Sequence, residues 1–248
     1  MDTPARTIVI GGSGYVGAAI CRQLVRDGHA VVFTYCRNAA PARALAEELG
    51  VSALALDLAA EETIAPVLQK ACEALGGLDA LVIASGLATA HERAGQPLVP
   101  AWHEVAPDAF RRMLAVNVTG PFLACQWAAG RMAPQRRGRM VIIGSIDGVK
   151  PVPSPVDYAC CKAALVGLVQ SLAKDLGRHQ ILINLIAPGI LDGGIAALLS
   201  PELHAEYVKH CTLKRVGTPA EIAAWAAFLI GTRNTYVTGQ TVILDGGL

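Results

Sequence analysis

A tyrosine and a lysine four residues apart, Tyr158 and Lys162, are the side chains best suited to proton chemistry. On an α-helix a step of four residues rises about 6 Å and returns to nearly the same face, so the two side chains should project together. A free phenol has a pKa of about 10, and an ammonium beside it favours the phenolate and lowers that pKa. The pair could then exchange a proton with a carbonyl oxygen, although a bare Tyr-x-x-x-Lys is more often two surface neighbours.

Two polar residues are predicted to complete this group. Ser145 follows the apolar run 140–143, at the carboxyl end of a predicted strand, where ligands of open α/β sheets bind. Its hydroxyl would donate a hydrogen bond to the same carbonyl oxygen. Asn117, inside the predicted helix 108–132, could hold a water that links Lys162 to solvent.

A glycine-rich turn directly follows the apolar run 7–10 and opens a predicted helix. Such a turn places backbone N–H groups and the positive end of the helix dipole around a pyrophosphate, which predicts a dinucleotide site. The alternative is a turn that only packs a helix against a strand. The residues expected to contact the dinucleotide at this turn are Gly11, Ser13, Gly14, Tyr15 and Val16.

The residues after the second apolar run, 31–35, indicate which dinucleotide is expected. No acidic residue is in reach to bind the ribose 2′-hydroxyl of NAD, whereas Arg37 can pair with the 2′-phosphate of NADP. NADPH or NADP+ is therefore the predicted cofactor, with Asn38 beside the phosphate. The alternative is that Arg37 is a solvated loop charge.

Further cofactor contacts are expected where the third and fourth predicted strands end. Asp57 could accept a hydrogen bond from the adenine amine, although aspartate is also a routine turn residue at the end of a strand. Leu58, Ser85 and Gly86 lie at the same predicted edge of the sheet and are expected to line the cofactor site.

Short apolar runs alternating with helical patterns must position all of these residues. The runs are nearly continuous, as in strands buried on both faces, and they predict a single-domain, Rossmann-like, doubly wound α/β fold over residues 1–248 with a seven-stranded parallel sheet. Two long stretches, 86–106 and 187–214, are predicted to be irregular loops. The predicted strands are 7–10, 31–35, 53–56, 80–83, 140–143, 181–186 and 241–244, and the predicted helices are 16–26, 41–49, 60–75, 108–132, 157–177 and 219–230.

The composition excludes several classes of protein. A hydrophobic content of 53% with only 17% charged residues indicates a deep core and surface buried by sister subunits. The net charge of +1 with scattered cations argues against a nucleic-acid partner, and no uninterrupted apolar run approaches the ~20 residues of a membrane span. Seven cysteines without a Cys-x-x-Cys pair, together with an N-terminus that lacks a signal-like region, predict a reduced, cytoplasmic setting. The six histidines show no metal-binding spacing.

The glycine turn, Asn117, Ser145 and Tyr158-x-x-x-Lys162 together resemble the short-chain dehydrogenase/reductase family over essentially the whole chain. Further matches are Asn-Leu-Ile-Ala-Pro-Gly at 184–189 and the tail 236–247, which are similar to the branch that includes 3-oxoacyl-acyl-carrier-protein reductases. The resemblance implies a catalytic tetrad in which Lys162 also bonds the nicotinamide ribose. The implied tetrad is Asn117, Ser145, Tyr158 and Lys162.

The same resemblance implies a substrate and an assembly. Backbone at Pro188, Gly189 and Ile190 would contact the nicotinamide, and the segment 191–212 would cover the substrate. The substrate would be a ketone, such as a 3-oxoacyl thioester linked to an acyl carrier protein or to CoA, or a polyketide-like carbonyl. A homotetramer, or a homodimer, would form on the helix 157–177 and the C-terminal strand.

The sequence departs from the family pattern in three places. Ile10 stands where the family has threonine, and Tyr15 where it has a glycine. The family's Asn-Asn-Ala-Gly motif is here Ile-Ala-Ser-Gly at 83–86, and Asp-Gly-Gly at 192–194 replaces an expected threonine. We hypothesise that Ile10 and Ile83 replace a polar tie between two strands with an apolar contact, because removing both hydrogen-bonding groups can be nearly neutral.

Two other functions fit parts of the pattern. The altered glycine turn and the missing asparagines favour a catalytically silent, NADP-sensing protein, whereas the intact tetrad opposes that interpretation. An NAD-dependent alcohol dehydrogenase is opposed by Arg37 and by the absence of an acid near Tyr35.

Overall fold

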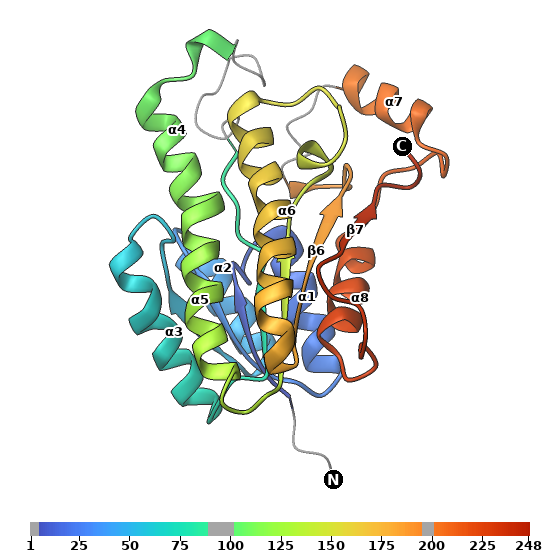
Figure 1. Cartoon of the computed structure of the whole chain (residues 1–248). Helices are drawn as coiled ribbons and strands as arrows, with labels where there is room; N and C mark the ends of the chain where they lie inside the picture. The colour runs from blue at the N-terminus through green and yellow to red at the C-terminus, as the bar shows by residue number, and fades with distance from the viewer. Residues whose placement is uncertain (1–4, 89–101, 195–200) are drawn as a thin grey trace.

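Apolar, β-branched segments form one parallel sheet in the order β3-β2-β1-β4-β5-β6-β7 (Figure 1). The computed structural model describes residues 5–88, 102–194 and 201–248. Every adjacent pair of strands is parallel, so the predicted Rossmann-like fold with seven parallel strands is confirmed. The strands are β1 (Arg6–Ile10), β2 (Ala30–Tyr35), β3 (Ser52–Ala55), β4 (Ala80–Ile83), β5 (Gly138–Ile143), β6 (Ile181–Pro188) and β7 (Thr241–Leu244).

Helices cover both faces of this sheet and enclose two apolar cores. Neighbouring residues of β1 divide between them: Ile8 and Ile10 belong to one core, and Val9 to the other. This alternation is what a strand buried on both faces requires. The first core lies under α3 (Glu61–Leu75), α5 (Gly120–Met132) and α6 (Val156–Leu176), and the second under α1 (Tyr15–Arg26), α2 (Ala39–Leu49) and α8 (Pro219–Ile230) (Figure 1).

Local sequence signals set several helix ends. Thr218 and Glu221 form a complete capping box at the start of α8. Gly50 and Gly76 end α2 and α3 in the left-handed conformation, which glycine adopts without steric cost. By contrast, α1 begins at Gly14 with no side-chain cap and no acidic residue in its first turn.

The predicted helix 108–132 is broken in the structure. It consists of α4 (Pro107–Leu114), a π-helical turn η3 (Ala115–Thr119) and then α5. Asn117 lies in the middle of that turn, where its side-chain amide bonds the backbone of neighbouring segments. A π-helical turn inside an α-helix is frequently found at a functional site.

One helix lies inside a stretch that we expected to be irregular. Residues Pro201–His210 form α7, and none of these residues is buried in the chain. The shorter helical turns are η2 (Trp102–Glu104), η4 (Ile146–Gly148) and η5 (Gly177–His179).

One helix of the described residues, Val156–His179, is long and apolar enough to cross a membrane by length and composition alone. The sequence-based expectation considered only uninterrupted apolar runs, and this helix contains Lys162 and Lys174. A single such helix is weak evidence, because a core helix passes the same test. Only 28% of its apolar window is buried within the chain, so much of this helix surface is left for another contact.

The apolar tie between Ile10 and Ile83 is confirmed. The two residues are register partners in the pairing of β1 with β4. Both are 1% exposed and belong to the same core. Two isoleucines therefore fill the position where the resembled family places hydrogen-bonding side chains.

We expect the polar pair to be tolerated better than either polar residue alone. Ile10→Thr and Ile83→Asn should each lower the free energy of unfolding by roughly 1–3 kcal/mol, because each leaves a buried polar group without a partner. In the double variant the new side chains can bond each other, so its loss should be smaller than the sum by about 1 kcal/mol. Urea unfolding of the four proteins measures this coupling, and strictly additive losses would show that the two positions do not interact.

Candidate active site

The carboxyl ends of β1 to β6 lie along one edge of the sheet and carry the predicted site residues. In open α/β sheets this edge is where ligands bind. The catalytic candidates come from β5, α6 and the π-helical turn, and the cofactor candidates come from the loops after β1 to β4 and after β6.

Tyr158 and Lys162 project from α6 to the same place. The Lys162 Nζ lies 5.3 Å from the centroid of the Tyr158 ring. Lys162 is 4% exposed, so the ammonium is held inside the protein and not at its surface. The predicted pairing of these side chains on one helix face is confirmed.

Asn117 joins this group through the loop after β4. Its Oδ1 accepts a hydrogen bond from the Leu87 N–H at 3.1 Å, and its Nδ2 donates to the Leu87 carbonyl at 3.0 Å and the Met113 carbonyl at 3.1 Å. A Cβ added to Gly86 would lie 3.2 Å from both the Asn117 Oδ1 and the Lys162 Nζ. Both polar groups thus converge on Gly86, and the water that we expect Asn117 to hold stays a prediction.

Ser145 follows β5 and is oriented by a residue that we did not predict. Its hydroxyl donates a short hydrogen bond to the Asp147 carboxylate, and its Oγ accepts one from the Asp147 N–H at 3.3 Å. Ser145 is the N-cap of η4, so the serine position relative to the strand is fixed by the turn itself. Asp147 could have been noticed in the sequence, because it stands two residues after Ser145 and aspartate side chains often form hydrogen bonds with nearby groups in turns.

The expected lowering of the Tyr158 pKa is wrong for the folded chain. Burial of the phenol raises the Tyr158 pKa, and the negative charge of Asp147 raises it further, while a hydrogen bond with Ser145 acts in the opposite direction. The Lys162 amine lies over the ring, and its own pKa is lowered to about 8 by burial. At neutral pH the site therefore holds a protonated phenol beside an amine that is still largely charged.

The glycine turn after β1 is built by close backbone contacts. Gly11 has φ +78°, and a Cβ there would lie 2.7 Å from the Ser85 N. A Cβ on Gly17 would lie 2.1 Å from the Gly11 carbonyl oxygen, so neither position can hold a larger residue. The Gly14 N–H donates to the Gly11 carbonyl at 3.1 Å, so the uncapped start of α1 leaves the N–H groups of Ser13, Tyr15 and Val16 as the natural donors for an anion.

A pocket beside this turn carries two arginines. It is lined by residues from the ends of β1 to β4, and among them are Arg37, Asp57, Leu58, Ser85 and Gly86, all predicted to contact the cofactor. None of the ion pairs among the described residues involves Arg37. Asn38 lies next to it as the N-cap residue of α2.

The second arginine, Arg112, was not predicted. It comes from α4, and its Nη2 lies 3.8 Å from the Asp57 carboxylate. Asp57 also accepts a hydrogen bond from the Ala59 N–H at 2.9 Å, so it is a turn residue as well as part of the pocket. The sequence placed Arg112 and Val116 four residues apart, which indicates a shared helix face. Both residues line the pocket.

The loop after β6 is held by the C-terminal part of the chain. The Gly189 N–H donates to the Leu244 carbonyl at 2.9 Å, and the Ile190 N–H donates to the Tyr207 hydroxyl at 3.0 Å. A contact of Pro188, Gly189 and Ile190 with nicotinamide stays a prediction, and for the Ile190 N–H it requires Tyr207 to move. Within the predicted irregular loop 86–106, His91 and Arg93 lie outside the described residues.

A family model described as Enoyl-(Acyl carrier protein) reductase matches residues 13–248. The chain belongs to the short-chain dehydrogenase/reductase family, a family of oxidoreductases. It is 32% identical to the 3-oxoacyl-[acyl-carrier-protein] reductase FabG of Aquifex aeolicus, over 98% of this chain and 96% of that protein. It is 34% identical to the cyclic-di-GMP-binding biofilm dispersal mediator protein of Escherichia coli, over 98% and 97%. The solved structure of BdcA in complex with NADPH covers 98% of this chain with 94% of its own, at a TM-score of 0.83 and 32% identity.

For this short-chain dehydrogenase/reductase we expect that removing the buried amine stabilises the fold. Folding lowers the Lys162 pKa to about 8, so the unfolded chain binds more protons between that pH and the ordinary lysine pKa. Burial of the charge therefore costs stability below pH ~8, and the cost is relieved as the pH rises. Lys162→Met should raise the free energy of unfolding at pH ~7 by on the order of 1–3 kcal/mol, with a smaller gain at pH ~9.5. Urea unfolding at both pH values measures this, and a variant less stable than the parent at neutral pH would contradict it.

Proposed function

We propose that the protein is an NADPH-dependent reductase that delivers hydride to a ketone. The observation that carries the proposal is the convergence of a protonated tyrosine, a buried lysine, a serine and an asparagine at the carboxyl edge of the sheet. The same edge offers the uncapped start of α1 and a pocket with two arginines, which fit a phosphorylated dinucleotide.

The side chains of this site suit the reduction of a carbonyl. A bound NADPH would supply the hydride. The Tyr158 hydroxyl, kept protonated by burial, would transfer its proton to the carbonyl oxygen as negative charge develops there. Ser145 would donate a hydrogen bond to that oxygen in place of its bond to Asp147. The charged Lys162 would then stabilise the phenolate that proton transfer leaves behind.

The phosphate recognised by the pocket would be the 2′-phosphate of the adenosine. Arg37 follows β2 and Arg112 approaches from α4. Burial and the Asp57 carboxylate raise the pKa of the nearby Cys36 thiol, and Arg37 and Arg112 both act in the opposite direction. Two guanidinium groups therefore lie near one end of the pocket, and of these Arg112 is next to the Asp57 carboxylate while Arg37 is in no ion pair among the described residues. This arrangement favours NADPH over NADH, and it makes an NAD-dependent alcohol dehydrogenase the weaker candidate.

We take the substrate to be a 3-oxoacyl thioester or a polyketide-like ketone. Support comes from the family model and from the reductase of Aquifex aeolicus, whose names specify acyl-carrier-protein substrates. An acyl carrier protein is then the expected partner of the substrate-loaded form. The seven free cysteines of the chain agree with a reducing, cytoplasmic setting.

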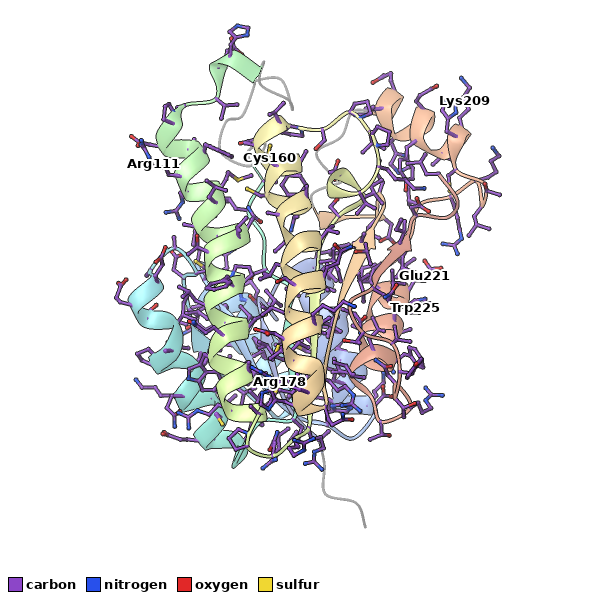
Figure 2. The ribbon with its side chains drawn as sticks, viewed as in Figure 1. Arg111, Cys160, Arg178, Lys209, Glu221 and Trp225 are labelled. Atoms are coloured by element: carbon purple, nitrogen blue, oxygen red, sulfur yellow. The ribbon has the colours of Figure 1, made fainter. Side chains whose placement is uncertain are left out.

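We also propose that copies of this chain associate as a homotetramer or homodimer. The apolar window of Val156–His179 is largely unburied within the chain. On the opposite side, Trp225 of α8 and Ile243 of the edge strand β7 are exposed, and Figure 2 shows Trp225 on the outer side of its helix. Burying these two surfaces against sister subunits would remove apolar area from water.

A nucleotide-sensing protein is the second candidate. The Escherichia coli relative is named for binding cyclic di-GMP, and its identity to this chain is as high as that of the reductase. The pocket arginines could serve a cyclic dinucleotide phosphate as well as the adenosine phosphate. A titration with cyclic di-GMP therefore belongs beside the one with NADPH.

The Tyr158 hydroxyl should be required for turnover and not for cofactor binding. Tyr158→Phe should lower the rate of ketone-thioester reduction by at least ~100-fold, because it removes the proton donor. Its NADPH affinity, followed by fluorescence titration, should stay within about twofold of the parent, since the ring remains. Tyr236→Phe, whose side chain is 94% exposed, serves as the matched control. Parental turnover in Tyr158→Phe would remove Tyr158 from the mechanism, and no turnover by the parent on any ketone would favour the sensor.

The two pocket arginines should determine the choice of cofactor. Arg37→Gln and Arg112→Gln should each weaken NADPH binding by about tenfold and leave NADH binding unchanged, because each removes a charge-assisted hydrogen bond to phosphate. Arg111→Gln is the matched control, since Arg111 is the neighbouring arginine on α4 (Figure 2). Its side chain is 74% exposed and pairs with Asp108. Equal affinity of the parent for NADH and NADPH would instead support an NAD enzyme.

A further inference from the structure

Tyr15, which stands in the glycine turn, contacts a loop far along the chain. Its hydroxyl donates a hydrogen bond to the Asp192 Oδ1 at 2.7 Å, across 177 residues of sequence. A Cβ added to Gly193 would lie 2.6 Å from the Tyr15 Cζ, and one on Gly194 would lie 3.0 Å from its Cδ1. The ring therefore lies directly against a backbone that has no side chains at these two positions.

This contact joins two strands that are not neighbours. Tyr15 follows β1 and Asp192 follows β6, and between them in the sheet lie β4 and β5. Three strand spacings correspond to about 14 Å. The two intervening strands lead to Gly86 and Ser145, so the contact bridges the stretch of the edge that holds the candidate site.

The loop after β6 is firmly anchored at its base. Leu191 forms a β-bridge with Gly217, the Asp192 N–H donates to the Gly217 carbonyl at 3.0 Å, and the Leu191 side chain is buried. Beyond the base, the carboxylate of Asp192 and the backbone of the two glycines meet the Tyr15 ring. Gly194 has φ +67°, a conformation that lets the chain turn closely past the ring.

We propose that Tyr15 and the segment Asp192–Gly194 form a clasp that gates entry and exit of the dinucleotide at the start of α1. The inference rests on the proposed function, because it requires a dinucleotide at the N–H groups of Ser13, Tyr15 and Val16. Tyr15 is 43% exposed, so its bond to Asp192 competes with water and can open readily. The bond also raises the Tyr15 pKa, so the hydroxyl remains a donor at neutral pH. Tyr15 acts here as a positioning residue, and it replaces a glycine that could make no such contact.

Stopped-flow fluorescence with NADPH tests the gate. In Tyr15→Phe and in Asp192→Ala we expect both the association and the dissociation rate constants to rise about three- to tenfold, because one hydrogen bond to a charged group is lost. The dissociation constant should change less than either rate. The double variant should be no faster than the single ones, since all three lack the same bond. Tyr236→Phe is the control and should keep the parental rates.

A second variant tests the packing and keeps both bonding groups. In Gly193→Ala the new methyl group would overlap the Tyr15 ring, so we expect the same acceleration as in Tyr15→Phe. Gly130→Ala is its control, because a Cβ at Gly130 meets no atom within 4 Å. Parental exchange rates in Gly193→Ala would overturn the proposed packing of the ring on the loop.

Hydrogen exchange without any nucleotide gives a readout that is independent of cofactor binding. The amides of residues 191–194 should exchange faster in Tyr15→Phe than in the parent, while those of β6 stay unchanged. If the parent binds NADPH but Tyr15→Phe changes neither the exchange nor the two rate constants, the clasp is wrong and the proposed function stands. A rise in dissociation alone would make Tyr15 a direct cofactor contact and also overturn the gate. A parent that binds no NADPH overturns the proposed function and, with it, the gate.

Discussion

Burial of the Lys162 ammonium is the constraint around which the site is arranged. A charged amine that is only 4% exposed costs folding free energy, as its lowered pKa shows, and the surrounding backbone fits closely around it. A Cβ on Gly148 would lie 2.3 Å from the Lys162 carbonyl carbon, so the turn after β5 packs directly on α6. The same turn carries Ser145, and Gly86 approaches the amine from the loop after β4. The turn after β5 and helix α6 thus bring serine, tyrosine and lysine to one point at the cost of stability, as is common in active sites.

The sequence could predict the sheet because buried parallel strands are continuous apolar runs that end in polar or glycine residues. The predicted strands 80–83 and 241–244 match β4 and β7 residue for residue. The other predicted strands differ from the observed ones by one or two residues at their ends. Tyr158 and Lys162 were equally accessible, since four residues along a helix fix a shared face. The Ile10–Ile83 contact could be foreseen once both polar partners were seen to be missing together.

What the sequence could not reveal depends on tertiary surroundings. The Tyr158 pKa is raised because burial and the charge of Asp147 outweigh the hydrogen bond with Ser145. The spacing of residues along a helix shows neither the burial nor the position of Asp147. The spacing of Arg112 and Val116 indicated a shared helix face, but it could not show that this face lines the same pocket as Arg37. Helix α7 buries none of its residues, so it lacks the core-facing apolar stripe that indicates most helices of a globular fold.

The departures from the family pattern touch one another in pairs. Ile10 faces Ile83 across β1 and β4, and Tyr15 lies on the segment Asp192–Gly194 across the carboxyl edge. A site that had merely lost its function would collect changes without such matching, because nothing would select the second member of each pair. Here the replaced residues contact each other, and Asn117, Ser145, Tyr158 and Lys162 are all present. This favours a working cleft in which contacts other than those of the family pattern hold the strands and loops together.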